Sequence, residues 1–457
     1  MPTTRDLLRA AALAALLAAR AAEAQGTGAR PVSADLAAAT FDSAWARIRD
    51  THYDPGMRGL DWNAVRRELR PRAERAGTIR ALRAVLGEML ARLGESHFAI
   101  IPQEAAEALD PGRRTDAAGD EPGDVGIALA LVGGDVVVAR VEPGSPAAAA
   151  GVHAGWVLDS VGAIGRGRVR EALARLTTPA ARRQAEYRLP VVGELALEGA
   201  AGSPAHATFL DGRGRTVAVT MRRRATPGAP IKFGNLPTFL ARLERERLPL
   251  PGAGGAGACA GVIRFNIWMP PLAAAIDSAV REVRGCRGVV LDLRGNPGGV
   301  AAMVMGASGY FLDSVQALGV MRARGTELRF NSVPRRVDDQ GTPTRPYAGP
   351  LAILVDERTA STSEIFAAGM QAVGRARLFG TPSSGQALPA LATRLQTGDV
   401  MMHVVADFVA PDGRRIEGHG AIPDEATPLT REALLAGHDP ALEAAVRWIT
   451  TAGSATP

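Results

Sequence analysis

The chain has 457 residues, of which 46% are hydrophobic, 22% charged and 4% aromatic. This length predicts about two to four domains, and the composition excludes a disordered, collagen-like or membrane-embedded chain. The net charge of +6 comes from interspersed basic and acidic residues, so no basic run predicts nucleic-acid binding. Lys232 is the only lysine, and the remaining 52 of the 53 basic residues are arginines.

Residues 1–25 have the features of an export signal. Arg5 and Arg9 form a basic start, an Ala/Leu run follows at 10–19, and a small-x-small cleavage site fits 22–24. The apolar run is too short to span a bilayer, and no later segment predicts an integral membrane helix. An arginine directly after the run shortens it to its lower limit, so an ordinary amphipathic helix is the alternative. We expect a periplasmic or secreted protein.

Residues 33–110 predict an N-terminal helical bundle that ends in Gly94-Glu95-Ser96-His97-Phe98. A polar stretch at 111–122, rich in Gly, Asp and Pro, predicts a linker. The apolar residues that recur at helical spacing are Leu36, Phe41, Trp45, Ile48, Leu82, Val85, Leu86, Met89, Leu90 and Leu93.

Residues 123–224 change to a pattern of short strands. Predicted strands at 125–129 and 136–139 flank the turn Gly133-Gly134, and Gly144-Ser145-Pro146 opens a short helix. With a closing strand at 216–221, this stretch resembles a PDZ domain of the bacterial protease type. An unrelated α+β module is the alternative, and residues 162–212 are longer than a plain PDZ domain needs.

The PDZ resemblance implies a peptide or protein partner whose C-terminus is bound as an added strand. Whether such binding delivers the substrate or gates the site is not readable from the sequence, and neither is the oligomeric state. The groove is expected along Val125, Gly126, Ile127, Ala128 and Leu129.

Residues 226–457 alternate strand and helix, which predicts an α/β core. Strands are expected at 261–266, 288–293, 351–355 and 376–379, and helices at 271–283, 300–310, 364–373 and 440–450. The two cysteines, Cys259 and Cys286, each stand three residues before a β-like run. If those strands are parallel neighbours, a disulfide is possible, and two buried free thiols are the alternative.

The segment Thr359-Ala360-Ser361-Thr362-Ser363-Glu364 lies between a strand and a helix. A serine there lies near free backbone N–H groups that favour negative charge, although Ser is also an ordinary N-cap. A second strand ends in a glycine-rich loop, Asn296-Pro297-Gly298-Gly299, which either cradles an anion or is a plain turn. It lacks the spacing of a nucleotide-binding motif.

Ser96-His97 and Glu417 complete the candidate residues. A lone histidine among seven is more often structural than catalytic, and His97 draws attention only because it joins a helix to a β-like run. Glu417 lies in a glycine-rich turn. No Cys/His cluster has metal-ligand spacing, so no metal or cofactor is expected.

Taken in order, these segments resemble the C-terminal processing (tail-specific) serine peptidases and the related tricorn-core peptidases. The matching motifs, read as they stand here, are LGESH, GVIRFNIW, DLRGNPGG, TASTSEI, EGHGAIPD and DPALEAAVRW. The resemblance implies a crotonase-like (ClpP/crotonase) α/β core and peptide cleavage by serine. It assigns the nucleophile to Ser361, with Ser363 as the nearby competitor.

The resemblance also decides between two kinds of base. The processing enzymes use a lysine that would stand at position 386, which is Gln386 here, and Lys232 lies in a different segment. The tricorn-like arrangement instead uses a histidine beside a serine, and a glutamate supports that serine. This implies His97 as base, oriented by Ser96 and Glu417. The implied oxyanion donors are the amides of Thr362 and of Gly298 or Gly299.

The resulting prediction is an exported serine endopeptidase that cleaves peptides or unfolded proteins. A catalytically inactive binding protein on the same scaffold is the alternative, because fold does not fix function. A crotonase-type enzyme acting on a thioester is a third hypothesis, which the PDZ-like segment and TASTSEI oppose. The sequence does not indicate a cleavage specificity.

Overall fold

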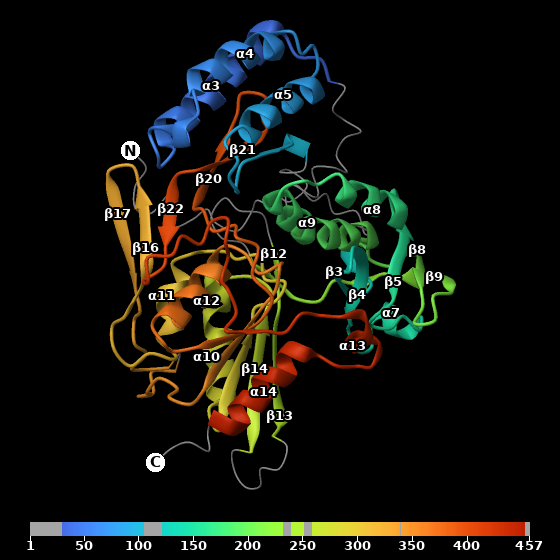
Figure 1. Ribbon diagram of the computed structural model, residues 1–457, viewed down its shortest axis with the longest axis vertical. Coiled ribbons are helices and arrows are strands. Elements are labelled where there is room, and N and C mark those ends of the chain that lie inside the picture. Colours follow the sequence, from blue (N-terminus) through green and yellow to red (C-terminus); the bar gives the residue numbers. More distant parts are fainter. Residues whose placement is uncertain (1–29, 105–120, 232–238, 251–257, 339, 453–457) are drawn as a thin grey trace.

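The computed structural model describes residues 30–104, 121–231, 239–250, 258–338 and 340–452. These form a layer of N-terminal helices, a smaller mixed module and a larger α/β core (Figure 1). The predicted export signal and Lys232 lie outside the described residues, as does most of the predicted linker.

The helical layer consists of α3 (Ala34–Thr51), α4 (Trp62–Glu74) and α5 (Ile79–Ala91). Each helix begins at a side-chain cap: Ser33, Asp61 and Thr78 accept a hydrogen bond from the backbone N–H three residues on. Most of the residues predicted at helical spacing form its buried face, although Leu36 is 38% exposed. A short 3₁₀ turn, η2 (Met57–Gly59), links the first two helices.

A hairpin from the far end of the chain completes this layer. Strand β1 (Ala99–Ile101) pairs with β21 (Val400–Val404), which pairs with β20 (Ala390–Arg394). Leu395 and Met401 pack into the helical core. The hairpin of β20 and β21, which lies within the predicted α/β core at 226–457, is therefore part of the helical layer.

The module is built on the sheet order β3-β4-β5-β8-β9, with β3 (Ile127–Val132) at one edge. The remaining strands are β4 (Asp135–Val141), β5 (Val157–Val161), β6 (Ile164–Gly165), β8 (Pro204–Leu210) and β9 (Thr216–Arg222). Its helices are α7 (Pro146–Ala149), α8 (Arg166–Ala174) and α9 (Pro179–Leu197). The stretch 162–212, unassigned from sequence, supplies α8, α9 and all of β8, and α9 packs along β3.

The core sheet has the order β13-β14-β15-β18-β19-β23, parallel except for β13. Its strands are β13 (Leu243–Pro249), β14 (Cys259–Phe265), β15 (Gly288–Asp292), β18 (Leu351–Val355), β19 (Arg377–Gly380) and β23 (Glu425–Ala426). One face carries α10 (Ala273–Val283), α11 (Met303–Ser308) and α12 (Thr362–Ala372), and the other carries α14 (Pro440–Ala452). The strands read as continuous apolar runs because both faces are covered.

Small elements join these parts. Strands β16 (Ala317–Ala323), β17 (Thr326–Asn331) and β22 (Ala406–Val409) form a three-stranded sheet. Arg324, in the turn between β16 and β17, donates to the carbonyls of Arg49 and His52 at the end of α3. The other elements are β2 (Pro122–Asp124), β7 (Gly199–Ala200), β10 (Arg224–Ala225), β11 (Ala229–Ile231), β12 (Phe239–Ala241), η4 (Pro270–Leu272) and α13 (Arg431–Leu435).

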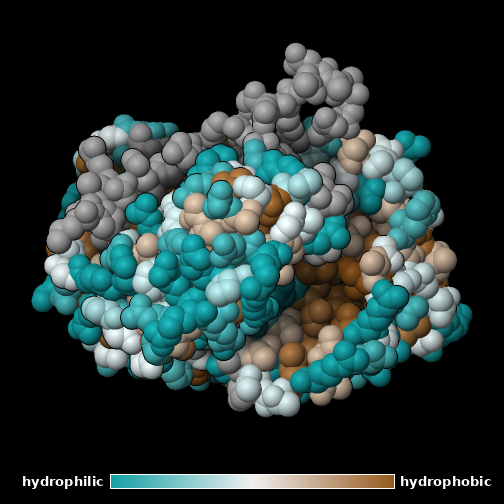
Figure 2. Space-filling model, turned by 90° about the horizontal axis from the view of Figure 1, so that it is seen from above, coloured by the Kyte–Doolittle hydropathy of each residue, from teal (hydrophilic) through white to brown (hydrophobic). Residues whose placement is uncertain are grey.

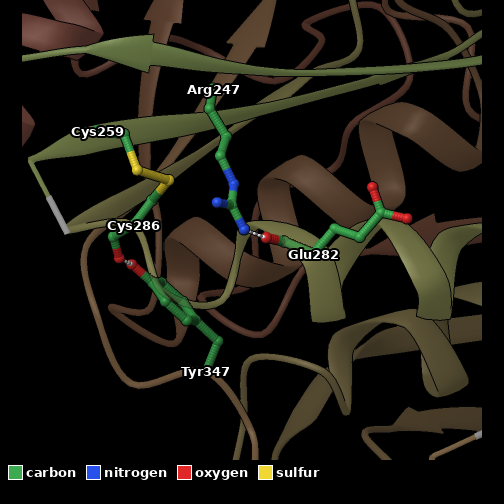
Figure 3. The surroundings of a disulfide bond; sticks show 5 residues. All are labelled: Arg247, Cys259, Glu282, Cys286 and Tyr347. Atoms are coloured by element: carbon green, nitrogen blue, oxygen red, sulfur yellow. Dashed lines mark hydrogen bonds between the residues drawn. A yellow bond between two sulfur atoms is a disulfide. The ribbon is translucent and has the colours of Figure 1, made fainter. Parts of the chain in front are cut away.

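Cys259 and Cys286 form a disulfide with Cα atoms 4.8 Å apart (Figure 3). Their strands β14 and β15 are parallel neighbours, as the disulfide prediction required. One detail differs: β14 begins at Cys259 itself rather than three residues later. Tyr347 donates from its hydroxyl to the carbonyl of Cys286 at 2.9 Å, and Arg247 donates to the carbonyl of Glu282 beside the bridge.

Seen from above, the surface is hollowed by a deep, predominantly hydrophobic depression (Figure 2). Within the described ranges, no helix has the length and apolar character needed to cross a bilayer.

Candidate active site

Ser361 lies at the first turn of α12, directly after β18 and a short turn. Its backbone has φ 56° and ψ −118°, in the region that non-glycine residues rarely adopt, and it is 1% exposed. Such a conformation persists only where the surroundings hold it. Here the N–H of Ser361 is within bonding distance of the carbonyl of Gln386 at 3.0 Å and of Glu364 Oε2 at 2.8 Å.

Glu364 is the residue that holds this turn, and the sequence reasoning did not assign it a role. Its buried carboxylate accepts from the N–H of Ser361, from Gly385 N–H at 2.7 Å and from Gln386 N–H at 3.0 Å. Two hydroxyls, of Ser383 and Ser384, also donate to it. Burial raises the pKa of Glu364 to about 7, against the effect of these donors. The available signal was the S-x-x-E spacing of a capping box.

The competitor Ser363 has a structural contact instead. Its side chain is fully buried and its Oγ accepts a hydrogen bond from Trp268 Nε1 at 2.8 Å. That hydroxyl therefore takes part in the packing between α12 and the segment after β14.

The adjacent residues Ser96 and His97 are brought together with Glu417, which lies 321 residues after Ser96 in the chain. Ser96 Oγ lies 2.7 Å from His97 Nδ1 and donates to Glu417 Oε2 at 2.9 Å. The Ser96 hydroxyl donates its single proton to Glu417, so toward His97 it can only accept. Nδ1 of His97 is therefore assigned as the protonated nitrogen that donates to Ser96, and Nε2 as the unprotonated nitrogen that can accept a proton.

Glu417 is fixed by backbone as well as by the hydroxyl. Its carboxylate also accepts from the N–H of Ser96 and from the N–H of Ala387, each at 2.9 Å. Burial raises the pKa of Glu417, and these donors oppose the rise. His97 itself is 6% exposed and has φ 61°, a second strained backbone position in the candidate site.

The glycine loop passes close to Ser361. A Cβ added to Gly298 would lie 2.7 Å from Ser361 Cβ and 2.9 Å from Thr362 N, and one on Gly299 would lie 2.0 Å from the carbonyl oxygen of Trp268. Both positions therefore require glycine. The two amides differ, because Gly298 N–H donates to Asn296 Oδ1 at 2.9 Å. Gly299 N–H has no such acceptor among the described residues, and its carbonyl accepts from Thr362 Oγ1.

The predicted peptide groove is open over only part of its length. Residues 125–128 line a cavity of about 210 Å³ between the module and the core. At Leu129 the strand edge is already occupied, because Leu129 N–H donates to Glu194 Oε1 and Arg358 donates to the Leu129 carbonyl. Arg358 and Glu194 also pair directly through two bonds of 2.6 and 2.7 Å. Of the predicted stretch, Val125 and Gly126 precede β3 rather than belong to it.

A second cavity, of about 760 Å³, lies between the module and the loops that support the site. Its wall includes Leu131 and Arg183 from the module and Ser383, Ile416 and His419 from the core. Across the described part of the chain, no group of three or more His, Cys, Asp or Glu residues is arranged to hold a metal ion.

Comparison with known proteins gives matches over most of this architecture. Residues 260–427 match the sequence profile of peptidase family S41, and residues 37–91 match that of the tricorn protease C1 domain. The chloroplastic C-terminal processing peptidase of Tetradesmus obliquus is 27% identical over 397 residues, which cover 84% of this chain and 76% of the relative. The carboxyl-terminal-processing protease of Picosynechococcus sp. is 26% identical over 392 residues, covering 84% and 82%.

Two solved structures share the fold. The photosystem II D1 C-terminal processing protease has a TM-score of 0.55 at 22% identity, with 90% of this chain and 97% of that chain covered. Mature CPAF has a TM-score of 0.56 at 13% identity, with 92% and 96% covered. The chain is therefore a serine peptidase whose α/β core matches peptidase family S41 over residues 260–427.

Proposed function

We propose that the protein is a serine endopeptidase in which Ser361 is the nucleophile and His97 the general base. The observation that carries the proposal is the hydrogen-bonded chain from Glu417 through Ser96 to His97 Nδ1. This chain orients the imidazole, keeps Nε2 available for a proton and stabilises the imidazolium that forms. His97 thus takes the place of the lysine base, which is absent because position 386 is Gln386.

The reaction follows from these roles. Ser361 Oγ attacks the scissile carbonyl carbon while its proton passes to His97 Nε2. The tetrahedral oxyanion is held by the N–H groups of Thr362 and Gly299, at the positive end of α12. His97 then protonates the leaving amine, and the acyl-enzyme forms. A water molecule, deprotonated by the same imidazole, releases the carboxylic acid product and restores Ser361.

We take the core as crotonase-like and the module as a PDZ-like domain that binds a peptide C-terminus along residues 125–128. The cavity there and the edge position of β3 support this proposal. Export to the periplasm or the cell exterior is supported by the disulfide, since such bonds persist in oxidising compartments.

The test uses a fluorophosphonate probe and digestion of an unfolded protein. Wild type is expected to be labelled at Ser361, and Ser361→Ala and His97→Ala are each expected to lose labelling and cleavage. Because the residues act as a unit, the double variant is expected to lose no more than either single one. Ser363→Ala is the matched control, two residues away, and is expected to keep labelling.

An unlabelled, folded wild type would favour the inactive binding protein instead. Full cleavage by Ser361→Ala would refute the assignment of the nucleophile. For the module, binding of a peptide with a free C-terminus to Ser361→Ala is expected to exceed binding of the same peptide amidated at its C-terminus. Equal affinities, measured by fluorescence anisotropy, would contradict C-terminal recognition.

A further inference from the structure

A buried ionic cluster next to the Ser96–His97 segment is not used by the proposed mechanism. Its centre is Glu95, whose side chain is 3% exposed. Glu95 Oε1 accepts from Tyr53 Oη at 2.5 Å and from Arg58 and Arg415, each at 3.0 Å. Glu95 Oε2 lies 3.0 Å from His52 Nε2. A carboxylate with this many donors on both oxygens is firmly fixed in place.

The partners of Glu95 come from two parts of the molecule. His52 and Tyr53 follow the end of α3, whereas Arg415 belongs to the core and stands two residues before Glu417. Arg415 is held on its other side by Asp407, to which its Nε donates at 2.8 Å. Glu95 and Arg415 therefore join the segment that carries His97 to the segment that carries Glu417.

The packing of rings continues this link toward the histidine. His52 stacks on Tyr53 with ring centroids 4.6 Å apart and on Phe98 at 6.2 Å. His97 thus has a neighbour fixed on each side, Glu95 through Ser96 on one and Phe98 on the other. Two anchors are what a residue with φ 61° needs, because such a backbone conformation relaxes when its surroundings do not hold it.

We propose that Glu95 is a positioning residue of the peptidase, which holds Ser96 and His97 in register with Glu417 through its ion pair with Arg415. This rests on the proposed function, because it concerns the base of that same reaction. Glu95 exerts its role in the proposed reaction through Ser96 and His97 and not on the reacting atoms. It acts by keeping the helical layer and the core together at the point where the relay crosses between them.

The charge of Glu95 is suited to this role. Burial alone would raise the pKa of Glu95, but the hydrogen bonds from His52, Tyr53 and Arg58 lower this pKa to about 2. The carboxylate is therefore ionised at neutral pH. Neutralising Glu95 leaves Arg415 paired with Asp407 inside the core, but it removes the ion pair that joins Arg415 to the helical layer.

The experiment uses the full chain with the isosteric substitution Glu95→Gln, with Arg415→Gln, which shortens the side chain and removes its charge, and with their double variant. Glutamine keeps the size of Glu95, and its amide can donate to His52 Nε2 if the ring proton moves to Nδ1. That proton would then be donated to the Asp54 carbonyl at 3.0 Å, in exchange for the hydrogen bond that Nδ1 accepts from the Asp54 N–H at 3.2 Å. The fold is therefore expected to persist. Each single variant is expected to lower kcat about tenfold or more with KM little changed, since a displaced base slows the chemical step and not binding.

The double variant is expected to lose no more than the worse single variant, because both changes break the same link. Glu88→Gln is the matched control: it removes a carboxylate from the same helical layer whose ion pairs with Arg72 and Arg92 are exposed. It is expected to keep wild-type kcat. Circular dichroism and the melting temperature report whether each variant is folded.

Wild-type kcat in folded Glu95→Gln would overturn the proposal, as would losses that multiply in the double variant. If Glu95→Gln does not fold, Arg415→Gln decides alone by the same kcat criterion. These outcomes are separate from those of the proposed function. A dead Ser361→Ala with a fully active Glu95→Gln refutes only the positioning role, whereas an active Ser361→Ala refutes the nucleophile itself.

Discussion

Ser361 and His97 both have positive φ values, and each is held by a buried carboxylate. Glu364 holds the turn that carries Ser361, and Glu95 holds the segment that carries His97. The sequence motif contained Glu364 but gave no reason to choose it, because a serine with a glutamate three residues on is also an ordinary helix start. Its importance depends on the loop 383–386, whose approach is a long-range feature that local spacing does not encode.

Glu364→Gln is expected to destabilise the turn and to slow labelling of Ser361. Both carboxylate oxygens face backbone N–H groups, Gly385 on one side and Gln386 with Ser361 on the other. In either orientation the amide places its own N–H₂ against at least one of them. An unsatisfied buried donor costs about 1–3 kcal/mol, which urea denaturation measures.

Glu357→Gln is the matched control for that variant. Burial raises the pKa of Glu357 to about 7 as well, and it lies in the turn before Ser361. It accepts from the Thr381 hydroxyl, which can rotate to meet an amide. Its labelling rate is expected to stay near wild type, and an equal loss in the two variants would contradict a specific role for Glu364.

The low pKa of Glu95 predicts a pH dependence of stability. A carboxyl whose pKa falls from 4.5 to about 2 on folding stabilises the fold above pH 4.5, and this contribution is lost as the pH falls toward 2. The loss amounts to about 3 kcal/mol for this shift. Between about pH 5 and pH 2, wild type is expected to lose that much more stability than Glu95→Gln. If chemical denaturation showed the same loss of unfolding free energy with falling pH in wild type and in Glu95→Gln, this prediction would be contradicted.

At the scale of elements, the parallel strands bring the candidate site together at one end of the core sheet. Trp268 follows β14, the glycine loop follows β15, and Ser361 follows β18. The apolar runs predicted these strands nearly to the residue, because strands covered on both faces show little else. The predicted helix at 300–310 is shorter in the structure, α11 (Met303–Ser308). Val300 is instead bonded by its N–H to the Trp268 carbonyl, so the preceding loop extends into that segment.

The disulfide lies at the opposite end of these strands from the site. Replacing both Cys259 and Cys286 by alanine is expected to lower the free energy of unfolding by about 3.5 kcal/mol, given their sequence separation of 27. Fluorophosphonate labelling at 25 °C is expected to be unchanged. Reductant is expected to shift the melting temperature of wild type but not that of the variant, and slower labelling of the folded variant would contradict this separation.

At the scale of the whole molecule, each part of the site depends on contacts between segments far apart in the chain. The pairing of β1 with β21 places the His97 segment on the core, and Arg358 ties the turn before Ser361 to the module. The sequence predicted the separate parts and, through the family resemblance, the residues of the relay. It did not predict these junctions, because nothing in the local sequence shows which partner any one of the 52 arginines has.

The junction at Glu194 and Arg358 is expected to fasten the module to the core. The pair is mostly buried, with side chains 20% and 14% exposed, and both groups also cap the β3 edge at Leu129. Glu194→Gln leaves the Arg358 charge uncompensated, which costs about 3–5 kcal/mol for a buried pair. Hydrogen exchange is expected to become faster at the Leu129 N–H, and the melting temperature is expected to fall.

A second, more exposed ion pair also joins the module to the core, and it serves as a control for the effect of burial. Arg140 in the module contacts Glu244 in the core at 3.0 Å, but their side chains are 36% and 46% exposed. Glu244→Gln is therefore expected to cost less than about 1 kcal/mol and to leave exchange at Leu129 unchanged. Equal effects of the two variants would mean that burial of the ion pair makes no difference, and that Glu194 and Arg358 have no special part in fixing the β3 edge at Leu129.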